Sequence, residues 1–197
     1  MIHGFRMVWY WPGVRCQPDE LAVLLGLLAK GGVQVLRLRP DYDRGLPPWH
    51  PDSPFRNLLT GPEEEKADWW LGLSLGAAVA ACVAATIEPQ ARPARLTLIN
   101  PVVDRAALAR ERGFLMEKGW ELRLTDLPPP SVSQLDLVIS AADERVPAWH
   151  GESFREHCIG HPLSYFSFDA DHTFSSPSTQ ERLAVALLQG TLHAALA

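Results

Sequence analysis

Short apolar segments recur along this chain, and enough residues to form a helix or a long loop separate each one from the next. The segments typical of strands are 5–11, 33–38, 69–73, 95–99, 135–140 and 163–168. Several are continuously apolar, as expected for strands that helices cover on both faces. Strands joined by a helix pair most readily in parallel. The sequence therefore predicts an α/β fold, with a mostly parallel sheet of about six strands flanked by helices.

The first and last predicted helices carry clear end signals. In the first, Pro18 suits the first helical position, Gly31 and Gly32 end the helix, and an apolar stripe runs along it. The stripe consists of Leu21, Leu24, Leu25 and Leu28. In the last, Ser178 and Glu181 have the spacing of a capping box, directly after a proline. We expect this C-terminal helix to cover one face of the sheet.

The composition is that of a globular domain. The 197 residues contain no internal repeat and no change of composition that would divide them, so we expect a single domain over 1–197. The net charge of −5 and the dispersed basic residues argue against nucleic-acid binding. The sequence has neither an apolar stretch of the ~20 residues that a membrane span needs nor a secretory signal pattern. Three widely spaced cysteines indicate no disulfide framework, and we expect a cytoplasmic protein.

A serine between two glycines follows the predicted strand 69–73. Gly72-Leu73-Ser74-Leu75-Gly76 matches the motif G-x-S-x-G, in which a strained turn between strand and helix exposes the serine hydroxyl. The small residues at 77–85 favour a helix that packs closely on the sheet. The positive end of that helix would face a developing oxyanion. The context predicts that Ser74 is a nucleophile, and a tight turn without chemistry is the alternative.

A serine nucleophile needs a histidine that accepts its proton and a carboxylate that orients the histidine. Asp143 follows the predicted strand 135–140, and His172 follows 163–168. The ends of parallel strands share one edge of the sheet, where α/β folds gather their ligands. We therefore predict Ser74 as the nucleophile, His172 as the base and Asp143 as the acid.

Other acids and histidines compete less well for these roles. Glu144 is the nearest alternative to the predicted acid, whereas Asp136 begins its strand and should lie at the opposite edge of the sheet. His150, His157 and His161 precede the last predicted strand. For these three we expect surface or packing roles.

The segments around Ser74, Asp143 and His172 resemble the nucleophile, acid and base segments of small bacterial esterases and thioesterases of the α/β-hydrolase family. The resemblance covers nearly the whole chain, without the first two strands and the sizeable lid of larger members. It implies an oxyanion hole made by the backbone N–H of Leu75 and a second N–H from Val14 or Arg15. It also implies hydrolysis without a metal or another cofactor.

Two regions are candidates for contacts with substrate. Residues 104–118 predict a helix that is either a short lid over the site or an ordinary covering helix. Its apolar side would carry Ala107, Leu108, Phe114 and Leu115. Trp49 and Trp149 are candidates for an acyl pocket, with packing as the alternative.

The predicted activity is cleavage of a carboxylic ester or thioester through an acyl-enzyme. The substrate would be a small molecule, free or bound to a carrier protein. Arg37, Arg39 and Arg44 are candidate contacts for an anionic group or a carrier, and solvated ion pairs are the alternative. Two other functions stay open: acyl transfer or cyclisation through the same intermediate, and a hydrolase-like fold that only binds a ligand.

Overall fold

A parallel sheet of six strands forms the centre of the protein. The structure, a computed structural model, describes residues 5–14, 17, 19–38, 50, 67–116 and 119–194. The strands are β1 (Met7–Trp11), β2 (Gln34–Arg37), β3 (Trp69–Leu73), β4 (Arg95–Ile99), β5 (Gln134–Ser140) and β6 (Leu163–Phe168). They pair in the order β2-β1-β3-β4-β5-β6, and every described pair is parallel. The predicted α/β fold is therefore confirmed.

The strand order reverses direction at β1. From this strand the chain moves to β2 on one side and then returns to β3 on the other side. In open parallel sheets, ligands bind beyond the carboxyl ends of the strands at such a reversal. Val14 lies in the turn that follows β1, and Ser74 directly follows β3. The topology thus brings two of the predicted site residues to this position.

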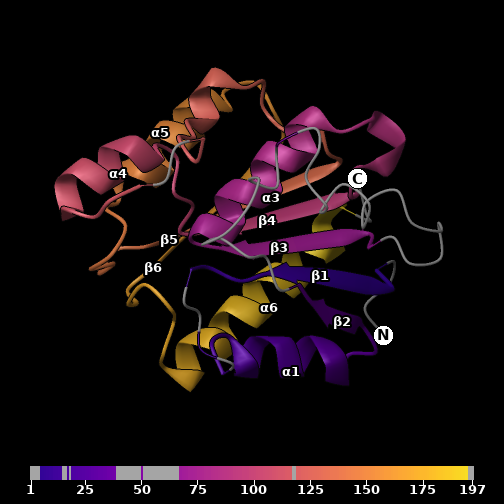
Figure 1. The fold of residues 1–197 in the computed structure, drawn as a ribbon. Coiled ribbons are helices and arrows are strands. Elements are labelled where there is room, and N and C mark those ends of the chain that lie inside the picture. Colours follow the sequence, from indigo (N-terminus) through magenta and orange to yellow (C-terminus); the bar gives the residue numbers. More distant parts are fainter. Residues whose placement is uncertain are drawn as a thin grey trace.

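Helices cover both faces of the sheet (Figure 1). They are α1 (Ala22–Lys30), α3 (Leu75–Thr86), α4 (Arg105–Arg112), α5 (Trp149–His157) and α6 (Pro177–Ala194). One buried cluster joins α1 and α6 to one face, and a second joins α3, α4 and α5 to the other. Because both faces are covered, strands such as β3 and β4 are buried along their whole length.

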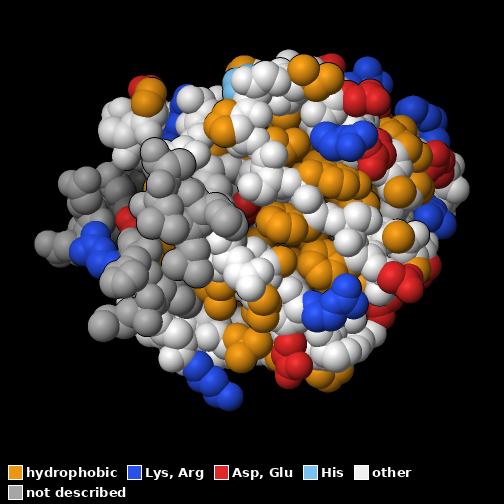
Figure 2. All heavy atoms as spheres, turned by 180° about the vertical axis from the view of Figure 1, so that it is seen from behind, with side chains coloured by type: hydrophobic (Ala, Val, Ile, Leu, Met, Phe, Trp, Pro, Cys, Tyr) orange, Lys and Arg blue, Asp and Glu red, His pale blue; other side chains and the backbone are white. Residues whose placement is uncertain are grey.

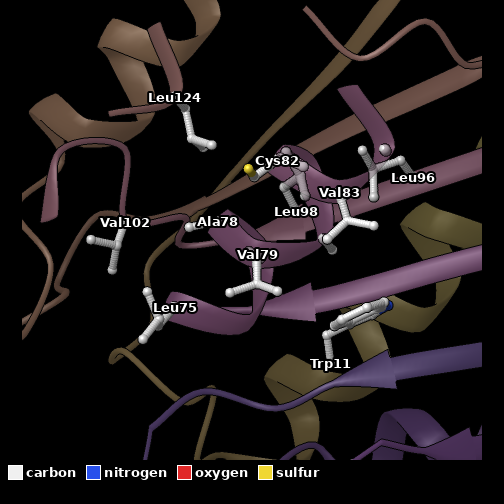
Figure 3. Close-up of a cluster of buried hydrophobic side chains, with 14 of the residues drawn as sticks. Trp11, Leu75, Ala78, Val79, Cys82, Val83, Leu96, Leu98, Val102 and Leu124 are labelled. Atoms are coloured by element: carbon white, nitrogen blue, oxygen red, sulfur yellow. The ribbon is translucent and has the colours of Figure 1, made fainter. Parts of the chain in front are cut away.

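Helix α3 lies deep in the second of these clusters. All its residues from Leu75 to Ala84 are buried, and Figure 3 shows its side chains among Trp11 of β1, Leu98 of β4 and Leu124. Alanine and valine predominate here, so the helix axis can approach the sheet closely. The small residues at 77–85 therefore allow the close packing of helix on sheet that their size predicts.

A buried ion pair lies at the other edge of the sheet, where β4 begins. Arg95 Nε donates to Asp136 Oδ2 over 2.6 Å, and both side chains are fully buried. Thr97 Oγ1 donates to the same carboxylate oxygen, and Arg95 also donates to the carbonyl of Leu187 in α6. Asp136 therefore joins β5 to β4, and Arg95 joins β4 to α6, at the edge of the sheet that the sequence predicted for Asp136.

The C-terminal helix starts two residues earlier than the predicted capping box implies. The helix begins at Pro177, which supplies the fixed φ that a first helical residue needs. The N–H groups of Thr179 and Gln180 donate to the carbonyl of Ser176, and the Ser178 hydroxyl contacts the Ser176 hydroxyl. The predicted capping box between Ser178 and Glu181 is therefore not the device that starts this helix.

The helix predicted over 104–118 is shorter than expected. It ends at Arg112, because Gly113 adopts a left-handed conformation (φ 69°) and its N–H bonds the carbonyl of Ala109. Asp104 caps its start by accepting the N–H of Ala107. Four candidate residues lie outside the described residues: the possible oxyanion donor Arg15 and the candidate contacts Arg39, Arg44 and Trp49.

Candidate active site

Ser74 occupies a strained turn between β3 and α3. Its backbone has φ 58° and ψ −123°, a conformation that costs a non-glycine residue roughly 1–3 kcal/mol. Backbone hydrogen bonds hold it there: its N–H donates to the carbonyl of Ile99 over 2.8 Å, and its carbonyl accepts the N–H of Ala78 over 3.2 Å. The predicted geometry of the turn is therefore present.

The two glycines of the motif are needed because three backbone segments meet here. A Cβ on Gly72 would lie 2.5 Å from Cα of Ala77 in α3, and a Cβ on Gly76 would overlap the carbonyls of Trp11 and Pro12. Glycine thus allows α3 to start against β3 and against the turn after β1.

Asp143 and His172 form a buried hydrogen-bonded pair. His172 Nδ1 lies 2.7 Å from Asp143 Oδ2, and the side chains of His172 and Asp143 are only 4% and 2% exposed. When Nδ1 carries the proton and donates to the carboxylate, Nε2 is an acceptor. The structure therefore brings together the acid and base residues that the sequence predicted.

The competing carboxylate, Glu144, contacts the backbone instead of the ring. Its Oε2 accepts the N–H of His172 over 3.2 Å, and its other oxygen pairs with Arg145 over 3.2 Å. Its side chain is more than half exposed. Between the two neighbouring acids, only Asp143 reaches the imidazole.

Asn100 links three parts of the site and was not among the residues predicted from the sequence. Its Nδ2 donates to the carbonyl of His172 over 2.9 Å and to the hydroxyl of Ser140, while its Oδ1 accepts the N–H of Ser140. It is buried and has a positive φ of 46°. An asparagine directly after a predicted strand was the available signal, since asparagine tolerates this conformation and bonds nearby backbone.

A cavity of about 360 Å³ contains Ser74 and His172 in its lining. The other lining residues are Val14, Leu75, Val102, Arg105, Leu108, Phe114, Leu115, Arg145 and Val146. Both predicted oxyanion residues, Val14 and Leu75, are thus at the cavity. In the part of the chain that the structure describes, Ser74 Oγ and the His172 ring form no direct hydrogen bond. This does not separate them as a pair, because such bonds are often long until substrate binds.

Of the regions predicted to contact substrate, the segment that includes α4 lines the cavity and Trp149 does not. Leu108, Phe114 and Leu115 border the cavity, so α4 and the residues after it form part of its wall. Trp149 is not among the lining residues: it is 39% exposed, and its ring stacks on His150 with centroids 3.8 Å apart. The structure does not bring Trp149 to the cavity.

His150 supports the loop that leads into the cavity wall. Its Nδ1 accepts the N–H groups of Val103 and Asp104 over 3.1 and 3.2 Å. The side chain is fully buried, and this burial lowers the pKa of His150 to about 4. The neutral ring therefore fixes the segment between Val102 and Arg105, which is a packing role.

The part of the chain that the structure describes holds no cluster of His, Cys, Asp or Glu suited to bind a metal ion. No described helix has both the length and the apolar character needed to cross a bilayer.

Known proteins resemble this chain in structure and not in sequence. The sequence matches no protein-family model and no curated protein. The esterase domain of a Rhodothermus marinus protein is similar in structure, with a TM-score of 0.69 and 21% identity over 93% of this chain and 84% of its own. The Lactococcus lactis sugar hydrolase YeeB has a TM-score of 0.73 and 17% identity, covering 96% and 89%.

The carboxylesterase Cest-2923 of Lactobacillus plantarum gives a similar result, with a TM-score of 0.69 and 17% identity over 94% of this chain and 86% of its own. Likeness at these identities establishes architecture. The chain has the α/β-hydrolase fold.

Proposed function

We propose that this protein is a serine hydrolase that cleaves a carboxylic ester or a thioester through an acyl-enzyme. The observation that carries the proposal is the buried Asp143–His172 hydrogen bond of 2.7 Å, at the same cavity as a serine on a strained turn. The esterase and carboxylesterase names of the similar structures support an ester as the substrate.

Each of the three side chains has one role in the proposed reaction. His172 Nε2 accepts the proton of Ser74 Oγ while that oxygen attacks the carbonyl carbon. The histidine then gives the proton to the departing alcohol or thiol, which leaves an acyl group on the serine. Water, activated by the same nitrogen, releases the carboxylic acid and restores the serine. Asp143 keeps His172 in the required tautomer throughout.

The oxyanion of this reaction would be stabilised by backbone N–H groups. Leu75 is the first residue of α3, and the first N–H groups of a helix have no partner within it. The helix dipole adds positive potential at the same point. Val14 lies in the turn after β1 and lines the same cavity, and we propose its N–H as the second donor.

Hydrolysis of a panel of esters and thioesters with varied acyl chains tests this function. We expect turnover of at least one class by the wild type, and a loss of roughly 10³-fold or more in kcat in Ser74→Ala. Ser133→Ala, which removes a serine on a loop outside the cavity lining, is the matched control. Equal rates in the wild type and Ser74→Ala would contradict the proposal.

A further inference from the structure

The cavity at Ser74 differs in charge from the rest of the molecule. Two arginines, Arg105 and Arg145, are among its described lining residues, and no acidic side chain is. The chain as a whole has a net charge of −5. On the face drawn in Figure 2, acidic and basic side chains lie close to one another. Because the charged residues in the described part of the lining are arginines, this part of the cavity favours an anionic ligand.

Arg105 is the first residue of α4, and the surrounding structure holds its side chain in place. Its guanidinium lies over the ring of Trp120, 4.9 Å from the centroid, and Nη1 donates to the carbonyl of Trp120 over 3.4 Å. A stacked and positioned guanidinium loses little freedom when it binds an anion.

Arg145 reaches the same cavity from the loop of the predicted acid. Its backbone N–H donates to Asp143 Oδ1 over 2.7 Å, so its position is fixed relative to His172. Its side chain pairs with Glu144 over 3.2 Å, and both partners are more than half exposed. Exposed pairs of this kind contribute little, so an anionic ligand can compete for the arginine.

Apart from Ser74, His172 and the two arginines, the described lining of the cavity is apolar. Leu108, Phe114 and Leu115 line it, and the last two are 41% and fully exposed. Binding of a hydrocarbon chain over these two side chains would be favourable, because it would remove their apolar surface from water. The cavity therefore combines a serine on a strained turn, an apolar wall and two cations.

From this combination we infer that the substrate is an ester or thioester that carries a second, anionic group, a carboxylate or a phosphate, and that Arg105 and Arg145 bind this group. The inference rests on the proposed function and specifies its substrate class. Arginine forms paired, charge-assisted hydrogen bonds to both kinds of group. The hydrocarbon between the anion and the ester would lie along the apolar wall.

Two matched pairs of substrates test the inference, one for each side of the ester bond. The para-nitrophenyl monoester of adipic acid is compared with that of adipamic acid, and para-acetoxybenzoate with para-acetoxybenzamide. In each pair an anion is replaced by a neutral amide of the same shape. We expect kcat/KM to be at least ~10-fold higher for the anion in one pair. The double variant Arg105→Gln with Arg145→Gln should bring this ratio close to one.

The control variant is Arg155→Gln, which removes an arginine paired with Glu152 outside the cavity and should keep the ratio. A second assay measures binding of the four compounds to Ser74→Ala and does not depend on the reaction. Equal constants for anion and amide in both pairs would overturn the inference and leave the proposed hydrolysis intact. Tighter binding of the anion without turnover dependent on Ser74 would support the arginine site and contradict the proposed function.

Discussion

Asp143 Oδ2 lies 2.7 Å from His172 Nδ1, while Oδ1 of the same carboxylate accepts the N–H groups of Arg145 and Val146, each over 2.7 Å. One carboxylate thus closes its own loop and joins it to the loop after β6. Because the two backbone N–H groups already hold the carboxylate in place, little further ordering is needed for it to orient His172.

Asp143→Asn should abolish most of the activity without unfolding the protein. An asparagine amide can donate to Nδ1 and so favour the tautomer with the proton on Nε2, which cannot accept the serine proton. We expect kcat to fall by about 10³- to 10⁴-fold, because the same change in serine proteases of the trypsin type has an effect of this size. Kinetics on a para-nitrophenyl ester measure this effect.

Glu144→Gln is the matched comparison, because Gln can still accept the N–H of His172. Its loss should stay within about 10-fold, since the residue does not contact the ring. Equal losses in the two variants would mean that Asp143 has no special part in the reaction.

Asn100→Ala should lower both activity and stability. The change leaves the buried carbonyl of His172 without the donor that lies 2.9 Å away, which costs about 1–3 kcal/mol of unfolding free energy. The loop that carries the imidazole then loses its tie to β4 and β5. Urea denaturation and ester kinetics measure the two effects.

Ser140→Ala is the control for this variant. It removes the hydroxyl that Asn100 also contacts, but it keeps the bonds to the Ser140 N–H and to the carbonyl of His172. A loss of activity as large in Ser140→Ala as in Asn100→Ala would show that the tie to His172 is unimportant.

The sequence predicted the architecture well because strand and helix patterns are local. The continuously apolar segments became the strands of a parallel sheet, and the glycines around Ser74 marked the turn at the end of β3. Loops after neighbouring parallel strands share an edge, and this rule placed Asp143 near His172 before any distance was known.

What the sequence did not predict depends on contacts between distant residues. The bonds of Asn100 to His172 and Ser140 span 72 and 40 residues, and no local pattern encodes them. The position of Trp149 on His150, away from the cavity, depends on how α5 packs. The early end of α4 is an exception, because its signal is local: Gly113 adopts the left-handed conformation that closes the helix well before residue 118.

Substitution of two glycines should have opposite effects on stability. In Gly76→Ala the new methyl group would collide with the carbonyls of Trp11 and Pro12, which are backbone atoms and cannot easily move. We expect a loss of about 3 kcal/mol or more, or no folded protein. Gly26→Ala, in α1 with open space around it, should gain ~0.5–1 kcal/mol. Thermal or urea denaturation that ranked the two variants in the opposite order would contradict this account of the turn.

Stability should fall in mild acid partly because of His150. Burial lowers the pKa of this residue from 6.5 to about 4, although Glu111, Asp104 and Asp143 partly oppose the shift. Between about pH 4 and 6.5, His150 therefore binds a proton in the unfolded chain but stays neutral in the folded protein. The contribution is complete above about pH 6.5 and is lost as the pH falls towards 4, by up to ~3 kcal/mol.

Urea denaturation between pH 4 and 7 measures this contribution. His150→Asn places an acceptor near the position of Nδ1 without a titrating group, so its curve should be flatter than that of the wild type. His161→Asn, at an exposed histidine, should keep the original slope. Parallel curves for the wild type and His150→Asn would contradict the assignment.

The most direct test of the central claim is covalent labelling by a fluorophosphonate, which reacts with serines that an adjacent base activates. Intact mass and peptide mapping should find one adduct on Ser74, absent in Ser74→Ala and much slower to form in Asp143→Asn. A folded wild-type protein that left Ser74 unlabelled, or carried the adduct on another residue, would contradict the account.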